Sequence, residues 1–379
     1  MPSSKRCTSG PRRRKPRASG GTSAGSGGHP RTTWRRCWRR SACTGSCSGP
    51  ASRCGCRRRA WQSWTCSILR RSSARRSNPR TRHVGLRADP VRRLEWGLLP
   101  AVPVPFRGRA LAEDAQRAYA RWMARQPVAG VAVWAHTGRG PHLSADERRC
   151  VLATWRAALS DKVIVAGATS PTMAQEAKAG GADLLLAFPQ RDDVVGYHEA
   201  LGRELPVIAF YLYEAAGGVP YDDATLHAIL ELPRVIGIKV ATLDSAVTFQ
   251  RIAALARAHP GKLLITGEDR FLGYSVLLGA RAALIGMGAA LTDLQAELLA
   301  AYARRDFATF LSLTSLCDAF GATAFAAPVE GYVQRMLWAL AAEGVVPDDA
   351  CDDPWRPALG AAERDAVQQA VREAREARR

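Results

Sequence analysis

The sequence lacks the features that would mark a membrane or secreted protein. No uncharged apolar run reaches the roughly 18 residues that a membrane span needs, and the arginine-rich N-terminus contains no apolar segment of the kind found in secretory signals. After residue 90 the chain has three cysteines, Cys150, Cys317 and Cys351, which is typical of a protein that folds under reducing conditions. We therefore expect a cytoplasmic protein that makes no membrane contact.

Acidic residues are almost absent from the first ninety positions. Residues 1–90 contain 23 lysines and arginines and one acid, Asp89, whereas residues 91–379 contain 31 basic and 33 acidic residues. The formal net charge of +20 therefore belongs to the first segment, and the rest of the chain is nearly neutral. Because the basic charge is confined in this way, it gives no reason to expect nucleic acid as a partner of the remainder.

Residues 1–90 also contain few large apolar side chains and show no helical or strand period, so we expect a disordered, low-complexity segment there. The arginine clusters would suit a basic arm that binds nucleic acid. Arginine and serine are common in transit peptides, but this segment is too long for one. A zinc site is a third interpretation, although its cysteines lack the paired C-x2-C spacing of such sites: Cys43, Cys47, Cys54 and Cys56.

A fourth interpretation of this segment is favoured. Arg, Gly, Pro, Ser, Trp and Cys are the residues that GC-rich DNA encodes when it is read in an unintended frame, so a start set upstream of the natural one would produce this composition. No methionine occurs between Met1 and Met123, and the natural start is therefore expected near Val84 or Val91.

From residue 94 onward, short apolar runs alternate eight times with amphipathic stretches, which is typical of a parallel α/β fold. The expected strands are Gly97–Val104, Gly130–Ala135, Lys162–Ala166, Asp183–Phe188, Val207–Leu212, Val235–Val240, Leu263–Thr266 and Ala282–Gly286. The expected helices include Ala110–Arg125, Ala145–Leu159, Thr172–Ala179, Ala224–Leu232, Ser245–Ala258 and Phe271–Leu278. Eight such units predict a TIM (β/α)8 barrel rather than an open nucleotide-binding sheet, because the first strand ends in Pro103–Phe106 instead of a glycine-rich turn.

Helical periodicity continues for some 90 residues after the eighth strand. We expect helices at Leu291–Arg304, Phe307–Phe320 and Val329–Glu343, and a charged, solvent-exposed helix at Ala361–Arg379. The chain therefore divides into a basic segment (1–90), a barrel (91–290) and a C-terminal helical extension (291–379).

A lysine lies inside the sixth expected strand, as Lys239 between Ile238 and Val240. Burying a charged lysine is costly, and desolvation lowers the pKa of the amine toward the neutral form that attacks a carbonyl and forms a Schiff base. A structural lysine paired with Glu214 or Glu268 is the alternative.

Two further strand ends carry polar groups, where a TIM barrel has its active site. Tyr211, near the end of the fifth strand, could carry a proton to or from a substrate hydroxyl, or it could be an aromatic residue that fills the barrel mouth. The hydroxyl of Thr137 and the backbone amide of Gly138, after the second strand, could hold a carboxylate, or they could belong to an ordinary turn.

Taken together, these motifs resemble the dihydrodipicolinate synthase and N-acetylneuraminate lyase family. The resemblance covers residues 94 to 345, and its most specific part is the Gly237-Ile238-Lys239 strand, with Tyr211 placed 28 residues before the lysine. The turn His136-Thr137-Gly138 and the Gly181-Ala182-Asp183 segment that opens the fourth strand also match.

The resemblance implies class I aldolase chemistry. Lys239 would form an imine with a 2-oxo acid such as pyruvate, Tyr211 would move the proton, and Thr137 with the amide of Gly138 would bind the carboxylate. Neither a metal nor an organic cofactor would be needed. The resemblance also implies a homo-oligomer, a homotetramer or a dimer.

Departures from the family pattern concern the substrate. His136 stands where the family has a hydroxyl, and we expect it to take over acid–base duty. Ala216 stands where the synthase branch has the arginine that holds aspartate semialdehyde, so lysine biosynthesis is not favoured. Further substrate contacts are expected from Arg139, Tyr213, Glu214, Gly267 and Glu268.

Three classes of function follow from these observations. The first is a Schiff-base lyase, either an aldolase or a dehydratase, with a true dihydrodipicolinate synthase as a less favoured form of it. The second is a catalytically silent barrel that binds a 2-oxo acid. The third is nucleic-acid binding through the N-terminal arm.

Overall fold

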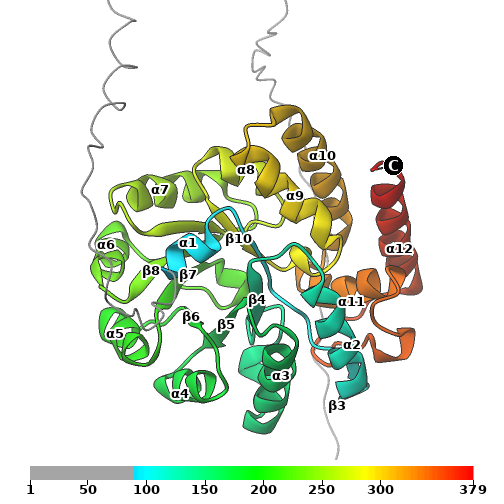
Figure 1. Ribbon diagram of the computed structural model, residues 1–379, viewed down its shortest axis with the longest axis horizontal. Coiled ribbons are helices and arrows are strands. Elements are labelled where there is room, and N and C mark those ends of the chain that lie inside the picture. Colours follow the sequence, from blue (N-terminus) through cyan, green and yellow to red (C-terminus); the bar gives the residue numbers. More distant parts are fainter. Residues whose placement is uncertain (1–88, 379) are drawn as a thin grey trace, which may run out of the picture. The chain divides into compact units, whose positions relative to one another are not determined.

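The computed structural model describes residues 89–378. The interpretations of residues 1–88, which include the basic arm and the cysteine-based zinc site, lie outside the described residues. Eight parallel strands form one sheet in the order β1-β10-β9-β8-β7-β6-β5-β4. They are β1 (Leu98–Pro100), β4 (Gly130–Val133), β5 (Val163–Ala168), β6 (Leu184–Ala187), β7 (Val207–Leu212), β8 (Val235–Ala241), β9 (Leu263–Thr266) and β10 (Ala282–Ile285). A parallel bridge between Ala101 and Ala132 joins the two edges of the sheet, so the strands form a nearly closed barrel (Figure 1).

Side chains on each strand alternate between the barrel interior and the surrounding helices. On β5, for example, Val163 and Val165 pack in the interior, while Ile164 and Ala166 pack against the helical layer. Because both faces of the sheet are buried, the strands are apolar throughout, and this is why each was recognisable as a continuous run. The TIM barrel prediction is confirmed.

Helices follow the strands and cover the outside of the barrel (Figure 1). They are α2 (Glu113–Ala124), α3 (Ala145–Ala158), α4 (Pro171–Ala179), α5 (Val194–Glu204), α6 (Asp223–Glu231), α7 (Ala246–Arg257) and α8 (Leu272–Leu277). Short polar side chains start several of them: Ser144 and Glu147 form a reciprocal capping box at α3, and Asp193 caps α5. The structure adds elements that were not expected, namely α1 (Pro90–Leu94) and a short hairpin of β2 (Phe106–Arg107) and β3 (Ala110–Leu111).

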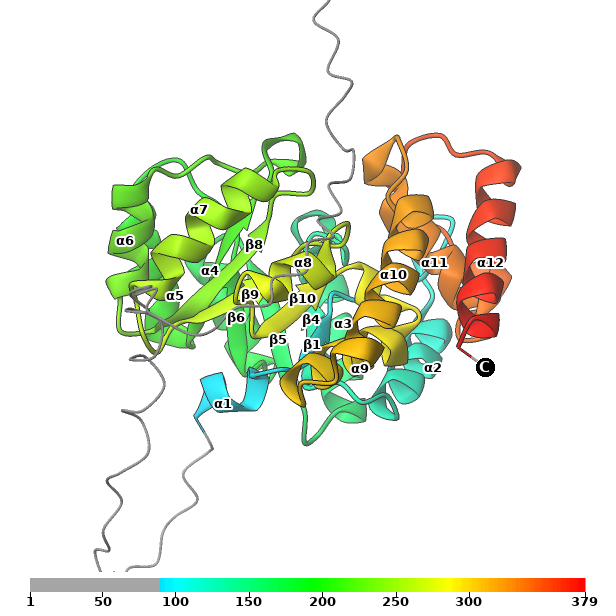
Figure 2. The same cartoon turned by 90° about the horizontal axis from the view of Figure 1, so that it is seen from above.

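Four helices form the C-terminal extension: α9 (Thr292–Ala303), α10 (Phe307–Ala324), α11 (Tyr332–Ala342) and α12 (Ala361–Glu376). The last helix is exposed along its charged face, as expected, but its other face is buried. α12 packs against α10 and α11, and it buries Val367, Val371 and Ala374 (Figure 2). These three residues are spaced by four and three positions, so they form one apolar stripe on an otherwise charged helix.

Helix α10 is the one helix within residues 89–378 whose length and composition would allow it to cross a membrane. Its mean hydropathy is 1.2, and Asp318 lies within it. In the structure α10 packs against α8, α9 and α12, and it buries Phe310, Cys317 and Phe320 in those contacts. This packing accounts for part of its apolar composition, since a third of the helix is buried while Phe307 and Leu311 stay more than half exposed.

Candidate active site

Lys239 points into the barrel from the middle of β8. Its neighbours Ile238 and Val240 face the helices, and its side chain is 6% exposed. A cavity of about 30 Å³ lies at this end of the barrel. It is lined by His136, Thr137, Phe210, Leu212, Tyr213, Lys239, Ala241, Leu243, Gly267, Asp269, Gly286, Phe325 and Tyr332.

The amine of Lys239 has no hydrogen-bond or ion-pair partner among residues 89–378. Its Nζ lies 4.1 Å from the centre of the Phe210 ring. Burial lowers the pKa of Lys239 to about 8, although the nearby carboxyls of Asp269 and Glu268 oppose the shift. A substantial fraction of the amine is therefore neutral near pH 8. The alternative of a lysine paired with Glu214 or Glu268 is not what the structure shows.

Tyr211 does not reach the cavity. The register of β7 and β8 pairs Phe210 with Lys239 and Tyr211 with Val240. Since neighbouring residues of a strand point to opposite faces, Phe210 faces the lysine and Tyr211 packs between the barrel and the helices. The position beside the amine thus carries an aromatic ring without a hydroxyl, and the assignment of Tyr211 as the proton carrier is corrected.

The turn after β4 brings His136 and Thr137 to the cavity. Both meet the hydroxyl of Tyr332, which lies 2.9 Å from Thr137 Oγ1 and 3.0 Å from His136 Nδ1. On the other side of the imidazole, His136 Nε2 lies 3.4 Å from Glu330 Oε2. Tyr213 donates its hydroxyl to Glu330 Oε1 at 2.9 Å. These five side chains form one continuous network beside Lys239.

Burial sets the protonation states in this network. It lowers the pKa of His136 to about 3, with the positive charges of Arg139 and Lys239 acting in the same direction, so the imidazole is neutral at pH 7. Burial also raises the pKa of the Tyr332 and Tyr213 hydroxyls, which therefore keep their protons. Because Glu330 faces Nε2, we assign the single imidazole proton to Nε2, which leaves Nδ1 to accept from Tyr332.

The backbone of this turn is strained on both sides. Trp134 has φ of 55° and Arg139 has φ of 51°, in the left-handed region that non-glycine residues rarely adopt. The amides of Thr137 and Gly138 between them have no acceptor among residues 89–378. These two amides and the Thr137 hydroxyl are the predicted carboxylate site.

Arg139 is buried and already paired. Its Nη2 lies 2.6 Å from Asp353 Oδ2, and both side chains are less than 10% exposed. A second contact, of 3.7 Å, joins Nη1 to Glu330 Oε2. Arg139 therefore connects the barrel turn to the C-terminal extension and has little capacity left for a substrate anion.

The other predicted contacts fall into different places. Glu268 is buried below the loop after β8, where its carboxylate accepts from the amide of Thr242 at 2.6 Å and that of Leu243 at 2.9 Å. Glu214 lies on an exposed turn (Glu214–Ala216) and does not line the cavity. Gly267 does line it, and a Cβ there would lie 2.6 Å from Lys239 Cε, so only glycine allows the lysine to pass.

The residues that were not anticipated in the site include Asp269, Phe325 and Tyr332, which line the cavity, and Glu330 beside it. Asp269 follows β9 and accepts from the amide of Met287 at 2.6 Å, and burial raises its pKa to about 7. Phe325 and Glu330 come from the connection between α10 and α11, and Tyr332 is the first residue of α11. A glutamate and a tyrosine on either side of Gly331, between two apolar helices, were the signal available in the sequence.

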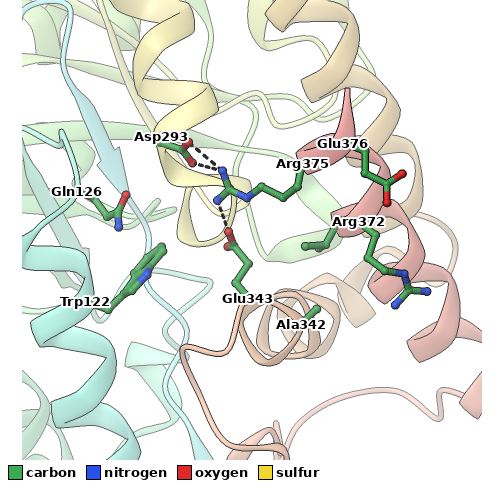
Figure 3. A pocket seen from close by; sticks show the side chains of 9 residues that line it. Trp122, Gln126, Asp293, Ala342, Glu343, Arg372, Arg375 and Glu376 are labelled. Carbon is green, nitrogen blue, oxygen red and sulfur yellow. Dashed lines mark hydrogen bonds and ion pairs between the residues drawn. The ribbon is translucent and has the colours of Figure 1, made fainter. Parts of the chain in front are cut away.

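Larger hollows lie away from Lys239. One of about 550 Å³ lies where α12 meets α2, and its Arg375 is already paired with Asp293 and Glu343 (Figure 3). Another of about 700 Å³ contains the ion pair of Arg156 with Asp183. Neither brings a nucleophile to a buried position. Residues 89–378 also contain no group of three or more His, Cys, Asp or Glu side chains placed to hold a metal ion.

Comparison with known proteins agrees with this architecture. The sequence model of the dihydrodipicolinate synthetase family matches residues 95–374. The 4-hydroxy-tetrahydrodipicolinate synthase of Ruegeria pomeroyi is 29% identical over 188 residues, which are 46% of this chain and 63% of that protein. The corresponding enzyme of a Synechococcus strain is 27% identical over 243 residues, or 59% of this chain and 79% of its own length.

Solved structures share the fold at lower identity. A prophage protein belonging to the dihydrodipicolinic acid synthase family from E. coli K12, in complex with pyruvate, has a TM-score of 0.65 at 19% identity and covers 74% of this chain and 98% of its own. A catalytic lysine mutant of the Ruminococcus gnavus sialic acid aldolase has a TM-score of 0.67 at 16% identity and covers 76% of this chain and 97% of its own. At such identities the likeness establishes the fold alone.

Proposed function

This chain belongs to the dihydrodipicolinate synthetase family, and we propose that it is a class I lyase whose Lys239 forms a Schiff base with a 2-oxo acid such as pyruvate. One observation carries the proposal: a lysine with no hydrogen-bond or ion-pair partner in the described chain is buried at the end of the barrel where such folds bind substrate. Lowering of its pKa by burial supports the same role, since the neutral amine is the nucleophile.

The proposed reaction begins with attack of Lys239 Nζ on C2 of the 2-oxo acid. A carbon–nitrogen bond forms, the carbonyl oxygen leaves as water with the two protons of the amine, and one further proton from solvent gives the protonated imine. The imine draws electrons from the bonds to the neighbouring carbon, so that a carbon–carbon or carbon–oxygen bond there can break or form.

Thr137 and the amides of Thr137 and Gly138 are proposed to hold the carboxylate of the 2-oxo acid. Gly286 lies against this group, and a Cβ at that position would be 2.9 Å from Thr137 Oγ1. The absence of a side chain there keeps the carboxylate site open.

The second substrate, or the second product of cleavage, is proposed to be uncharged. Arg139, the arginine expected at the distal end, is held by Asp353 and Glu330. A neutral hydroxyaldehyde therefore suits the site better than the semialdehyde of an acidic amino acid.

A silent barrel that binds a 2-oxo acid is the second candidate. It is favoured by Phe210, which leaves the strand position beside Lys239 without a hydroxyl for proton transfer. Both the lyase and the silent barrel would form an imine at Lys239, but only the lyase would convert its substrate into product.

Borohydride trapping tests the proposed function. The full chain is incubated with pyruvate and reduced, and its intact mass is compared with those of Lys239→Ala and Lys178→Ala. Lys178 is the control because it is a half-exposed lysine paired with Glu204 on the surface. We expect a stable adduct on the parent and on Lys178→Ala, and none on Lys239→Ala. No adduct on the folded parent with pyruvate or larger 2-oxo acids would overturn the proposal.

A further inference from the structure

We propose that Tyr332, supplied by the C-terminal extension, is the proton-transfer residue of this site, and that it is served by a relay through His136 and Glu330. The inference rests on the proposed function, because it assigns the group that moves protons to and from the Lys239 imine. It also separates the two candidates above, since a barrel with a working relay is not silent.

Within the described part of the chain, β7 places no free hydroxyl beside Lys239 that could transfer a proton. Phe210 has no hydroxyl, and Tyr211 faces the helices. Tyr213 does line the cavity, but its hydroxyl is donated to Glu330. The Tyr332 hydroxyl, in contrast, meets two groups of the barrel turn and lies in the same cavity as the amine.

The ring of Tyr332 is held firmly in position. It is 4% exposed, stacks on Phe325 with ring centres 4.7 Å apart, and lies so close to Gly286 that a Cβ there would be 2.9 Å from its Cε2. Such packing fixes the hydroxyl between Thr137 and His136, as proton transfer requires.

The relay has the order of a catalytic triad. The Glu330 carboxylate orients the His136 imidazole through Nε2, and Nδ1 accepts from the Tyr332 hydroxyl. Glu330 is itself held by the hydroxyl of Tyr213 and by Arg139, which donates to its backbone carbonyl at 3.4 Å. Its side chain is 38% exposed, so the relay runs from the buried cavity to solvent.

The proposed step is the conversion of the protonated imine into its enamine. A C–H bond next to C2 breaks, its proton passes to Tyr332 Oη, and the proton of Tyr332 passes to His136 Nδ1. The electron pair of the C–H bond forms the C=C bond of the enamine, and the π electrons of C=N move to the nitrogen of Lys239. The resulting imidazolium faces the Glu330 carboxylate, which lies 3.4 Å from Nε2 and opposes the burial that disfavours the positive charge. The same path in reverse protonates the enamine.

Exchange of the methyl protons of pyruvate in D2O measures this step without knowledge of the second substrate. Tyr332→Phe keeps the ring and removes the hydroxyl. We expect it to form the borohydride adduct but to exchange at least about 100-fold more slowly than the parent. Tyr274→Phe is the matched control, because Tyr274 is 39% exposed on α8 and its hydroxyl meets Gln250.

A second readout is specific to a relay. His136→Ala is expected to lose exchange, and added imidazole is expected to restore part of it, which a merely structural role would not allow. If Tyr332→Phe forms no adduct, Glu330→Gln, which alters the solvent end of the relay, is used in its place.

The outcomes distinguish the two proposals. A parent that forms no adduct overturns the proposed function itself. Adduct formation together with parental exchange in Tyr332→Phe, or in its substitute Glu330→Gln, overturns the relay and leaves the Schiff-base function standing.

Discussion

The barrel and the C-terminal extension bring different kinds of group to the cavity around Lys239. The barrel provides the amine from within β8 and the turn after β4 that carries Thr137. The extension provides Phe325 and Glu330 from the connection between α10 and α11, and Tyr332 from the start of α11. A nucleophile carried by a strand is tied to the whole sheet, whereas groups on a connection can be exchanged with little effect on the barrel. Under the proposals above, the barrel would supply the Schiff-base lysine and the His136 part of the relay, and the extension would supply the tyrosine hydroxyl and Glu330.

The largest effect, on the free energy of unfolding, is expected from the contact that joins the barrel to the C-terminal extension. Arg139 of the barrel turn and Asp353 of the extension are 6% and 2% exposed and paired at 2.6 Å. Asp353→Ala would leave a buried guanidinium largely uncompensated, and we expect a loss of about 3–5 kcal/mol in the free energy of unfolding. Urea denaturation measures it.

Arg149→Ala is the control for that measurement, because Arg149 is paired with Asp146 on the surface, where both side chains are more than 70% exposed. We expect no measurable change for it. Equal stability of Asp353→Ala and the parent would show that the extension does not depend on this contact.

A smaller effect, on the rate of methyl exchange, is expected when the hydroxyl is moved from Tyr332 of the extension to position 210 of the barrel. Phe210→Tyr places a hydroxyl on the strand beside Lys239, where Nζ now lies 4.1 Å from the ring centre. In a Tyr332→Phe background we expect it to raise the rate of methyl exchange about tenfold, which is less than the roughly 100-fold or more that a well-placed general acid–base group contributes. NMR of pyruvate in D2O reports the rate.

Tyr211→Phe in the same background is the control, since Tyr211 points to the helices. If both Phe210→Tyr and Tyr211→Phe restored methyl exchange, or if neither did, the strand position beside the amine would not determine the rate of proton transfer.

The smallest effect is a displaced pH profile. Burial lowers the pKa of Lys239 to about 8, and a lowered pKa means that the neutral amine predominates above that pH. The rate of adduct formation with pyruvate and cyanoborohydride is expected to rise with a midpoint near pH 8 and then level off. Asp269→Asn should lower the midpoint further, because the Asp269 carboxylate raises the lysine pKa. A rate that keeps rising beyond pH 10 would indicate an ordinary, solvated lysine.

Much of the fold could be predicted from local pattern. Strands β7 and β9 begin and end where the apolar runs do, because a strand buried on both faces needs apolar residues along its whole length. Lys239 stood out for the same reason, since a charged residue inside such a run requires an explanation. His136 and Thr137 were found because they follow a strand, and strand ends meet at one end of a barrel.

The error at Tyr211 has a simple physical cause. Spacing along the chain placed a tyrosine 28 residues before the lysine, but β7 and β8 pair with a register shift between Val207 and Ile208. One residue of shift reverses which side chain faces the interior. Phe210 therefore occupies the place that the motif assigned to a tyrosine.

The sequence by itself determined the eight-unit barrel, the buried lysine and the turn at His136-Thr137-Gly138, because each depends on residues close together in the chain. The tertiary structure alone decided which aromatic ring faces the amine and that Tyr332 and Glu330 reach His136. Those contacts join residues nearly 200 positions apart, across helices whose own periodicity describes only how they pack. The local pattern of apolar residues predicts which side chains are buried. Which distant polar side chains come into contact depends on how the helices and strands pack together.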